Sequence, residues 1–163
     1  MVGATEPVMT EDLADDSPQG LDLGNLPNMV GYVARRAQLM IFEDFIRTMA
    51  SVELRPASFS VMAVIDANPG STQSAVSAAL GLQRTNLVAI IDQLEERDLA
   101  QRRPAKGDKR SHALTLTAKG KRLLARALEL QTEHEKRVLG PLSAEEGRRL
   151  LEYLHRLVAG GDK

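Results

Sequence analysis

Apolar residues recur at spacings of three and four along most of the chain, which predicts a protein built mainly from amphipathic helices. The longest such stretches cover residues 27–51, 117–139 and 143–159. The last of them begins with a capping box formed by Ser143 and Glu146. All three have a wider apolar face than a small domain needs, so we expect them to join two copies of the chain.

Two shorter helices are predicted between the long ones. The first starts at Arg55-Pro56 and is ended by the strong turn sequence Asn68-Pro69-Gly70. The second has Ser71 or Thr72 as its cap, and Gly81 stands where a helix end favours a positive φ. A tight turn is therefore expected just after residue 80.

A further helix is predicted over residues 83–97. Leu87, Ile91 and Leu94 fall on one face of this helix, together with Ile90. Its opposite face is small and polar, with Thr85, Asn86, Ala89 and Gln93. Two helices joined through a glycine form a helix-turn-helix, whose second helix fits a major groove about 12 Å wide. Ordinary packed helices give the same pattern, so these residues alone do not decide between a helix-turn-helix and a plain pair of packed helices.

A basic hairpin is predicted next. Residues 99–103 and 111–116 have the character of strands, and residues 105–109 form a tip that contains Gly107. Cations at such a tip suit phosphates and the narrow minor groove. The predicted fold is all-α with a two-stranded β wing, a winged helix-turn-helix.

The net charge of −1 hides an uneven distribution. Residues 1–24 contain six acidic residues and no lysine or arginine, and we expect them to form a disordered tail outside the fold. Residues 25–163 hold all 21 basic residues and are the predicted folded domain. Residues 97–122 alone carry nine cations against two anions, which favours a polyanionic partner over an ordinary solvated surface.

Three motifs carry a family resemblance: LEERDL at 94–99, DKR at 108–110 and LTAKG at 116–120. In this order and spacing they resemble the MarR (multiple-antibiotic-resistance regulator) family, and the likeness covers residues 26–158. The resemblance implies a transcriptional regulator that binds double-stranded DNA as an intertwined homodimer. The DNA-binding lobe would be residues 55–116, flanked by the three long dimerisation helices. A ligand-responsive repressor of a palindromic operator is the expected function.

The resemblance also implies which residues meet DNA from the predicted reading helix. Asn86 has the bidentate geometry for adenine, and Arg84 suits guanine or phosphate. Both can instead be solvated residues of a first helical turn. The implied set at the start of this helix is Gln83, Arg84, Thr85 and Asn86.

On the wing, Arg110 matches the family's wing arginine, and Asp108 is expected to orient it through a carboxylate pair or, alternatively, to form the turn beside Gly107. The expected phosphate contacts are Arg102, Arg103, Lys106 and Lys109. Two departures from the family pattern are Asp98, where glycine is common, and Ala89, where a basic or polar residue is common. Asp98 can still adopt a left-handed conformation.

The first helix resembles that of regulators of aromatic-acid breakdown, some of which respond to coenzyme A thioesters. A small anionic aromatic effector is the implied ligand. Tyr32 would stack on its ring, and Arg35 or Arg36 would hold its carboxylate or phosphate. The alternative is that the two arginines pair with Glu43 or Asp44 of a neighbouring turn or subunit.

Other function classes have little support. The chain has no cysteine, and His112, His134 and His155 lack metal-site spacing, so we expect neither an enzyme nor a metal or cofactor and treat each histidine as a surface or interface residue. A pure protein-interaction module would explain the amphipathic helices but not the cationic hairpin. Without a leader or an apolar span, the chain is expected to be cytoplasmic.

Overall fold

The computed structural model of the chain describes residues 21–105 and 108–161, and for residues 104–105 and 108–112 it describes the backbone alone. The chain divides into two units, residues up to 40 and residues from 41 onward. The first unit contains a 3₁₀ turn at Leu26–Asn28 and the first part of helix α1 (Val30–Met49). The regular α-helix thus begins later than predicted.

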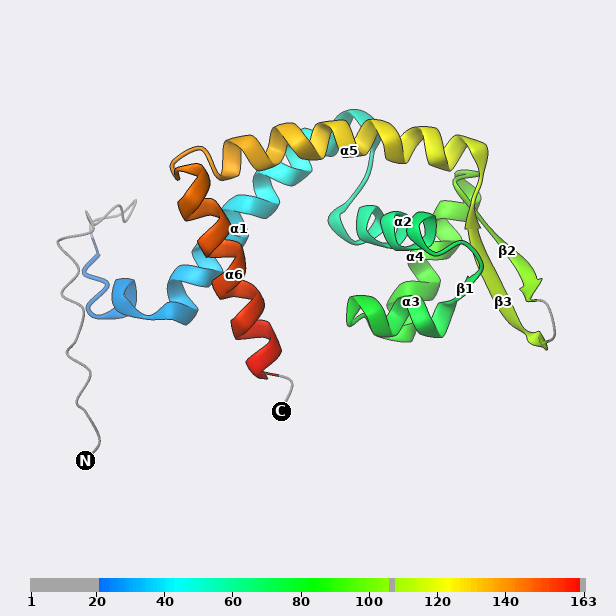
Figure 1. Cartoon of the computed structure of the whole chain (residues 1–163), viewed down its shortest axis with the longest axis horizontal. Helices are drawn as coiled ribbons and strands as arrows, with labels where there is room; N and C mark the ends of the chain where they lie inside the picture. The colour runs from blue at the N-terminus through cyan, green and yellow to red at the C-terminus, as the bar shows by residue number, and fades with distance from the viewer. Residues whose placement is uncertain (1–20, 106–107, 162–163) are drawn as a thin grey trace. The chain divides into compact units, whose positions relative to one another are not determined.

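The second unit contains the end of α1 and every later element (Figure 1). The predicted helices are all present among the described residues, and α6 continues through Gly161, slightly further than predicted. In chain order the elements after α1 are a 3₁₀ turn (Ala50–Val52), α2 (Pro56–Ala67), β1 (Ser71–Thr72), α3 (Gln73–Leu80), α4 (Arg84–Glu96), β2 (Ala100–Ala105), β3 (Asp108–Leu116), α5 (Ala118–Val138) and α6 (Ala144–Gly161).

The hydrophobic core lies where α2, α4, the sheet and the first half of α5 meet. Each contributes apolar side chains at the helical or strand spacing that the sequence predicts. Fully buried members include Met62, Ile65, Leu87, Ile91 and Leu114. The core therefore fixes α4 from one side only, and the other side of this helix stays exposed.

The sheet has three strands rather than the predicted two. β1 pairs with β3, with Ser71 opposite Leu114, and the order is β1-β3-β2. Gly70, with φ of 91°, turns the chain so that its amide donates to the Leu114 carbonyl at 2.8 Å. A two-residue strand is too short to show an alternating pattern, which is why the sequence did not reveal it.

Several predicted helix ends are confirmed. The Thr72 hydroxyl caps α3 by accepting from the Ala75 amide at 3.2 Å. Asp98 follows α4 with φ of 56°, in the left-handed region expected of it. The capping box of α6 is formed as well, because the Ser143 amide donates to the Glu146 carboxylate at 2.8 Å.

α5 packs unusually close to the junction between α4 and β2. A Cβ at Gly120 would lie 1.9 Å from the Leu99 carbonyl oxygen, so only glycine fits there. The Leu99 carbonyl also accepts from the Thr117 amide at 3.0 Å, and the Thr117 hydroxyl donates to the Asp98 carbonyl at 2.7 Å. The end of α4 is thereby joined directly to the start of α5.

In the described part of the chain, no single helix is long and apolar enough to cross a membrane; α3 and α4 reach that measure only taken together, and their axes are bent by 115°.

Candidate nucleic-acid interface

The helix-turn-helix is formed by α3 and α4. Their axes meet at 115°, within the range of roughly 90–120° typical of this motif. Gly81 makes the turn with φ of 61°, as predicted, and the Leu82 amide donates to the Ser77 carbonyl at 3.0 Å. The Ser77 hydroxyl donates to the Leu82 carbonyl at 2.5 Å, which fixes the turn from its other side.

α4 has one buried face and one exposed face. Leu87, Ile91 and Leu94 are buried in the core, whereas Ala89 and Gln93 are exposed. The predicted reading residues at its start are exposed too: Gln83, Arg84, Thr85 and Asn86. Their roles toward DNA stay predictions, but the start of α4 presents all four to solvent.

The start of α4 also suits an anion. Gln83 is the N-cap residue, and its side chain makes no capping hydrogen bond. The first turn contains no acidic residue, so the free backbone amides and the positive end of the helix dipole meet no internal carboxylate. Arg84 adds a full positive charge at the same place.

Arg102 differs from the other predicted phosphate contacts. Its guanidinium bonds to Asp92 of α4 at 2.7 Å and to the Glu95 carboxylate one turn later. Its backbone amide also donates to Glu95 at 2.7 Å. Because two carboxylates already occupy this half-buried side chain, its geometry favours a positioning role that holds β2 against α4 over the predicted phosphate contact.

The remaining wing residues are placed less fully. Arg103 is exposed on β2, and its guanidinium donates to the Gln101 side chain on the same strand at 3.3 Å. Asp108, Lys109 and Arg110 lie in β3, but their side chains are outside the described residues, as is the whole of Lys106. The predicted pair between Asp108 and Arg110 therefore stays a prediction.

The predicted effector residues belong to the first part of α1. Tyr32 is half-buried, and Arg35 and Arg36 are exposed. Within the subunit, Asp44 pairs with Arg47, His134 and Arg137. The alternative pairing of the two arginines with Glu43 or Asp44 of a neighbouring turn or subunit stays a prediction. Glu43 is exposed.

A buried ionic cluster was missed at the sequence level. Asp44 of α1 lies 2.8 Å from His134 Nδ1 of α5, and both side chains are almost fully buried. Hydrogen bonds from Arg137, His134 and Arg47 hold the pKa of Asp44 far below its usual range. The expectation that His134 is a surface or interface residue is wrong, since it packs edge-on against Phe45 inside the subunit.

The cluster had a sequence signal. His134 lies on the same face of α5 as the apolar Leu124 and Ala127, at the three-and-four spacing that passes through position 131. A polar residue in that register needs a buried partner, and Asp44 supplies it from a position 90 residues away. The cluster thus ties α5 to the end of α1.

Proteins of similar sequence identify the family of this chain. The MarR family model matches residues 53–111, which include the helix-turn-helix. Over 135 residues the chain is 32% identical to a transcriptional regulatory protein for the hcr operon of Thauera aromatica, spanning 82% of this chain and 81% of the relative. The chain belongs to the MarR family. It is therefore a winged-helix transcriptional regulator.

Solved MarR-family structures agree with this fold. The repressor CouR bound to a 23-mer DNA duplex is 44% identical, with a TM-score of 0.82 over 85% of this chain and 98% of CouR. CouR bound to p-coumaroyl-CoA is 42% identical over 85% of this chain and 97% of CouR, with a TM-score of 0.78. PcaV of Streptomyces coelicolor with its natural ligand is 26% identical over 86% of this chain and 99% of PcaV, with a TM-score of 0.77.

Proposed function

We propose that this MarR-family regulator is a repressor that binds an inverted-repeat DNA site as a dimer and is released by the coenzyme A thioester of an aromatic acid. The observation that carries the proposal is the exposed polar start of α4, held rigidly beside a wing by its buried opposite face. CouR, which resembles this chain over most of its length, has been solved with a DNA duplex and with p-coumaroyl-CoA.

In the proposed complex, α4 enters the major groove with its first turn leading. Asn86 reads a base edge, and Arg84 contacts a guanine or a phosphate. Arg103 and the basic wing tip then contact the DNA phosphates beside the groove. These contacts fix the position of the protein on the duplex without reading its sequence. We assign Arg102 to the support of the wing and not to DNA, because Asp92 and Glu95 already bind it.

A second copy of the chain covers the exposed apolar face of α6. Within the described residues, α6 buries only Gly147, although a stripe of large apolar side chains runs along it. Such a face is costly in water and suits a two-fold interface between copies. Its members are Leu150, Leu151, Tyr153, Leu154, Leu157 and Val158. Residues 25–163 then form one domain, with α1, α5 and α6 joining the copies and residues 55–116 reading DNA.

The effector is proposed to bind through the first part of α1. Tyr32 offers a ring for stacking, and the exposed Arg35 and Arg36 offer cations for an anionic ligand. CouR with p-coumaroyl-CoA makes a thioester the first choice for this chain. The ligand needs only to bind the DNA-incompetent state more tightly, and about 100-fold would shift the equilibrium by about 3 kcal/mol.

We propose no catalytic activity for the chain. Its relatives are transcriptional regulators, and His134 is buried with its Nδ1 bound to Asp44 in a structural cluster. Because the proposed partner is DNA, we also expect the protein to act in the cytoplasm.

The test selects bound duplexes from a random pool and measures their affinity by fluorescence anisotropy. We expect p-coumaroyl-CoA to weaken binding by about 5- to 150-fold, and p-coumarate or coenzyme A alone to do much less. Equal affinity for selected and random duplexes would refute sequence-specific binding. Unchanged affinity with the thioester would refute the effector while leaving DNA binding intact.

A further inference from the structure

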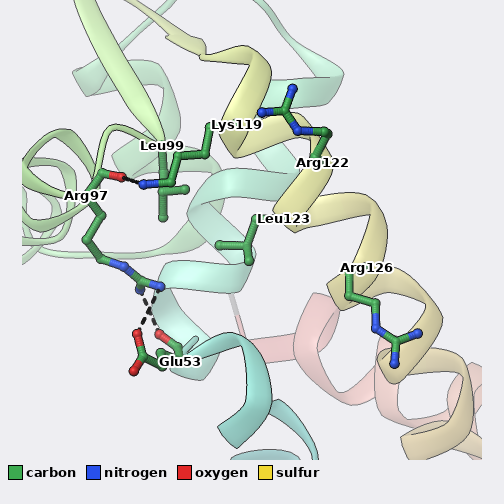
Figure 2. A pocket seen from close by; sticks show the side chains of 7 residues that line it. All are labelled: Glu53, Arg97, Leu99, Lys119, Arg122, Leu123 and Arg126. Atoms are coloured by element: carbon green, nitrogen blue, oxygen red, sulfur yellow. Dashed lines mark hydrogen bonds and ion pairs between the residues drawn. The ribbon is translucent and has the colours of Figure 1, made fainter.

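The side chain of Arg97 ties the end of α4 to the segment that follows α1. Arg97 is the C-cap residue of α4, and its guanidinium donates to the Glu53 carbonyl at 2.7 Å and to the Val52 carbonyl at 3.2 Å. Figure 2 shows the guanidinium facing both the carbonyl and the carboxylate of Glu53. Two bonds from one planar guanidinium to successive carbonyls fix its orientation as well as its position.

The segment that accepts these bonds has an unusual backbone. Glu53 has a φ of 52°, in the left-handed region, which costs free energy for any residue except glycine. Its amide donates to the Ala50 carbonyl at 3.2 Å, and its carboxylate lies 3.7 Å from the Arg97 guanidinium. Arg97 therefore contacts Glu53 through both its backbone and its side chain. These contacts stabilise the conformation with which the chain leaves α1.

The end of α4 is held from a second side by α5. Lys119 Nζ donates to the Arg97 carbonyl at 2.7 Å (Figure 2). The Thr117 hydroxyl donates to the next carbonyl, that of Asp98, at 2.7 Å. Carbonyls at the end of a helix have no partner within the helix, so α5 supplies the donors that α4 itself lacks. The end of α4 is thus bonded to the chain after α1 and to the start of α5.

These bonds constrain α4 in a way that its apolar packing does not. Burial of an apolar face is non-directional, whereas hydrogen bonds have a preferred direction. α4 has 13 residues and is therefore about 20 Å long. A change of direction of about 10° at its end would move its first turn by about 3 Å, which is close to the rise of one base pair.

We propose that Arg97 is the positioning residue that sets the direction of α4 relative to the end of α1 and the start of α5. The proposal rests on the proposed function, in which these helices join two copies and each α4 enters a major groove. In such a dimer the direction of α4 determines the distance between the two reading helices. Arg97 itself contacts no DNA, because two carbonyls already bind its guanidinium.

The test measures how strictly the protein selects the spacing of the half-sites. Full-length protein is titrated by fluorescence anisotropy with the selected inverted-repeat duplex and with duplexes whose central spacer is one base pair longer or shorter. One base pair shifts a half-site by about 3.4 Å and rotates it by about 35°, so the wild type should bind the altered spacers at least about tenfold more weakly. Arg97→Gln should reduce this difference to about threefold or less, because α4 then occupies several directions.

A second measurement separates positioning from contact with DNA. Arg97→Gln should leave the slope of affinity against salt unchanged, because no phosphate contact is lost. Arg97→Lys keeps the positive charge but replaces the planar guanidinium by a single ammonium. This variant should lose the spacing discrimination as well, and it decides the question by the same titrations if Arg97→Gln does not fold.

Val61→Ala is the control for lost stability. Val61 is fully buried in α2, so a shorter side chain there weakens the core without removing a hydrogen bond at the end of α4. We expect this variant to keep the spacing discrimination of the wild type.

The proposal is overturned if the Arg97 variants discriminate between the three spacers as the wild type does. It is also overturned if Val61→Ala loses the discrimination equally, or if Arg97→Gln flattens the salt dependence. A wild type that binds all three spacers with equal affinity would refute the two-fold dimer of the proposed function, so the two failures are distinguishable.

Discussion

Arg102 of β2 lies 2.7 Å from Asp92 of α4, so a single guanidinium joins the wing to the helix that carries the proposed reading residues. Glu95, one turn later on the same helix, accepts from both the guanidinium and the backbone amide of Arg102. The wing is therefore held in a fixed direction relative to α4. Its cations can contact the backbone only where α4 places them.

Substitutions of Arg102 and of Arg103, the next residue of β2, should therefore have different effects on DNA binding. Arg102→Ala should lower the stability of the lobe by about 1 kcal/mol or less, because its ion pairs are only half-buried. It should weaken DNA binding without changing the slope of affinity against salt, since no phosphate contact is lost. Arg103→Ala should flatten that slope by about one unit for each contact removed. Anisotropy titrations over a range of salt concentrations measure both.

An Arg102→Ala variant that flattens the salt dependence as much as Arg103→Ala does would contradict the positioning role of Arg102. That result would mean that the Arg102 guanidinium leaves Asp92 and binds phosphate in the complex.

Asn86 is expected to read a base. Asn86→Ala should cost about 1–3 kcal/mol on the preferred duplex and relax the preference at one base position. Affinity for random duplex DNA should stay as in the wild type, because the backbone contacts remain. Competition between the two duplexes measures the difference, and an equal loss on both would show that Asn86 reads no base.

Gly120 is expected to tolerate no side chain. Gly120→Ala should reduce the free energy of unfolding by about 3 kcal/mol or more, because its Cβ would overlap the Leu99 carbonyl. Gly147→Ala is the matched control, since its Cβ would make only ordinary contacts with the Leu139 side chain, at 3.7 and 4.0 Å. This helical replacement should change stability by about 1 kcal/mol at most, in the stabilising direction. Urea unfolding at one protein concentration compares them, and equal effects would contradict the close contact.

The Asp44 carboxylate should account for part of the stability that the protein loses in acid. Its pKa in the folded protein is held below the usual value of 3.8, chiefly by the hydrogen bond from Arg137 and then by that from His134. The stabilisation it provides is therefore complete above pH 3.8 and is lost as the pH falls toward the folded-state pKa.

Asp44→Asn should make the protein less stable at neutral pH and flatten the loss of stability below about pH 4. Urea midpoints measured from pH 3 to pH 7 test this expectation, with Glu152→Gln, an exposed position on α6, as the control for one lost carboxylate. A variant whose acid limb is as steep as that of the wild type would show that Asp44 is not the responsible group.

The spacing of apolar residues predicted those features of the fold that depend on residues close together in the sequence. The apolar spacing of α4 gave its buried face, and the position of Gly81 gave the turn before it, because both depend on neighbouring residues. The partners of Arg102 and His134 depend on how separate elements pack, and no local pattern specifies that. β1 is too short for any pattern at all.

The most direct test of the central claim, that two joined lobes read one DNA site, is the spacing of the half-sites. A two-fold dimer places its reading helices in successive major grooves, so the selected duplex should be an inverted repeat with centres about 34–36 Å apart. We predict that inserting half a helical turn between the half-sites abolishes specific binding in anisotropy titrations, while base changes in the central spacer do not. Undiminished affinity for the duplex with the half-turn insert would contradict the account.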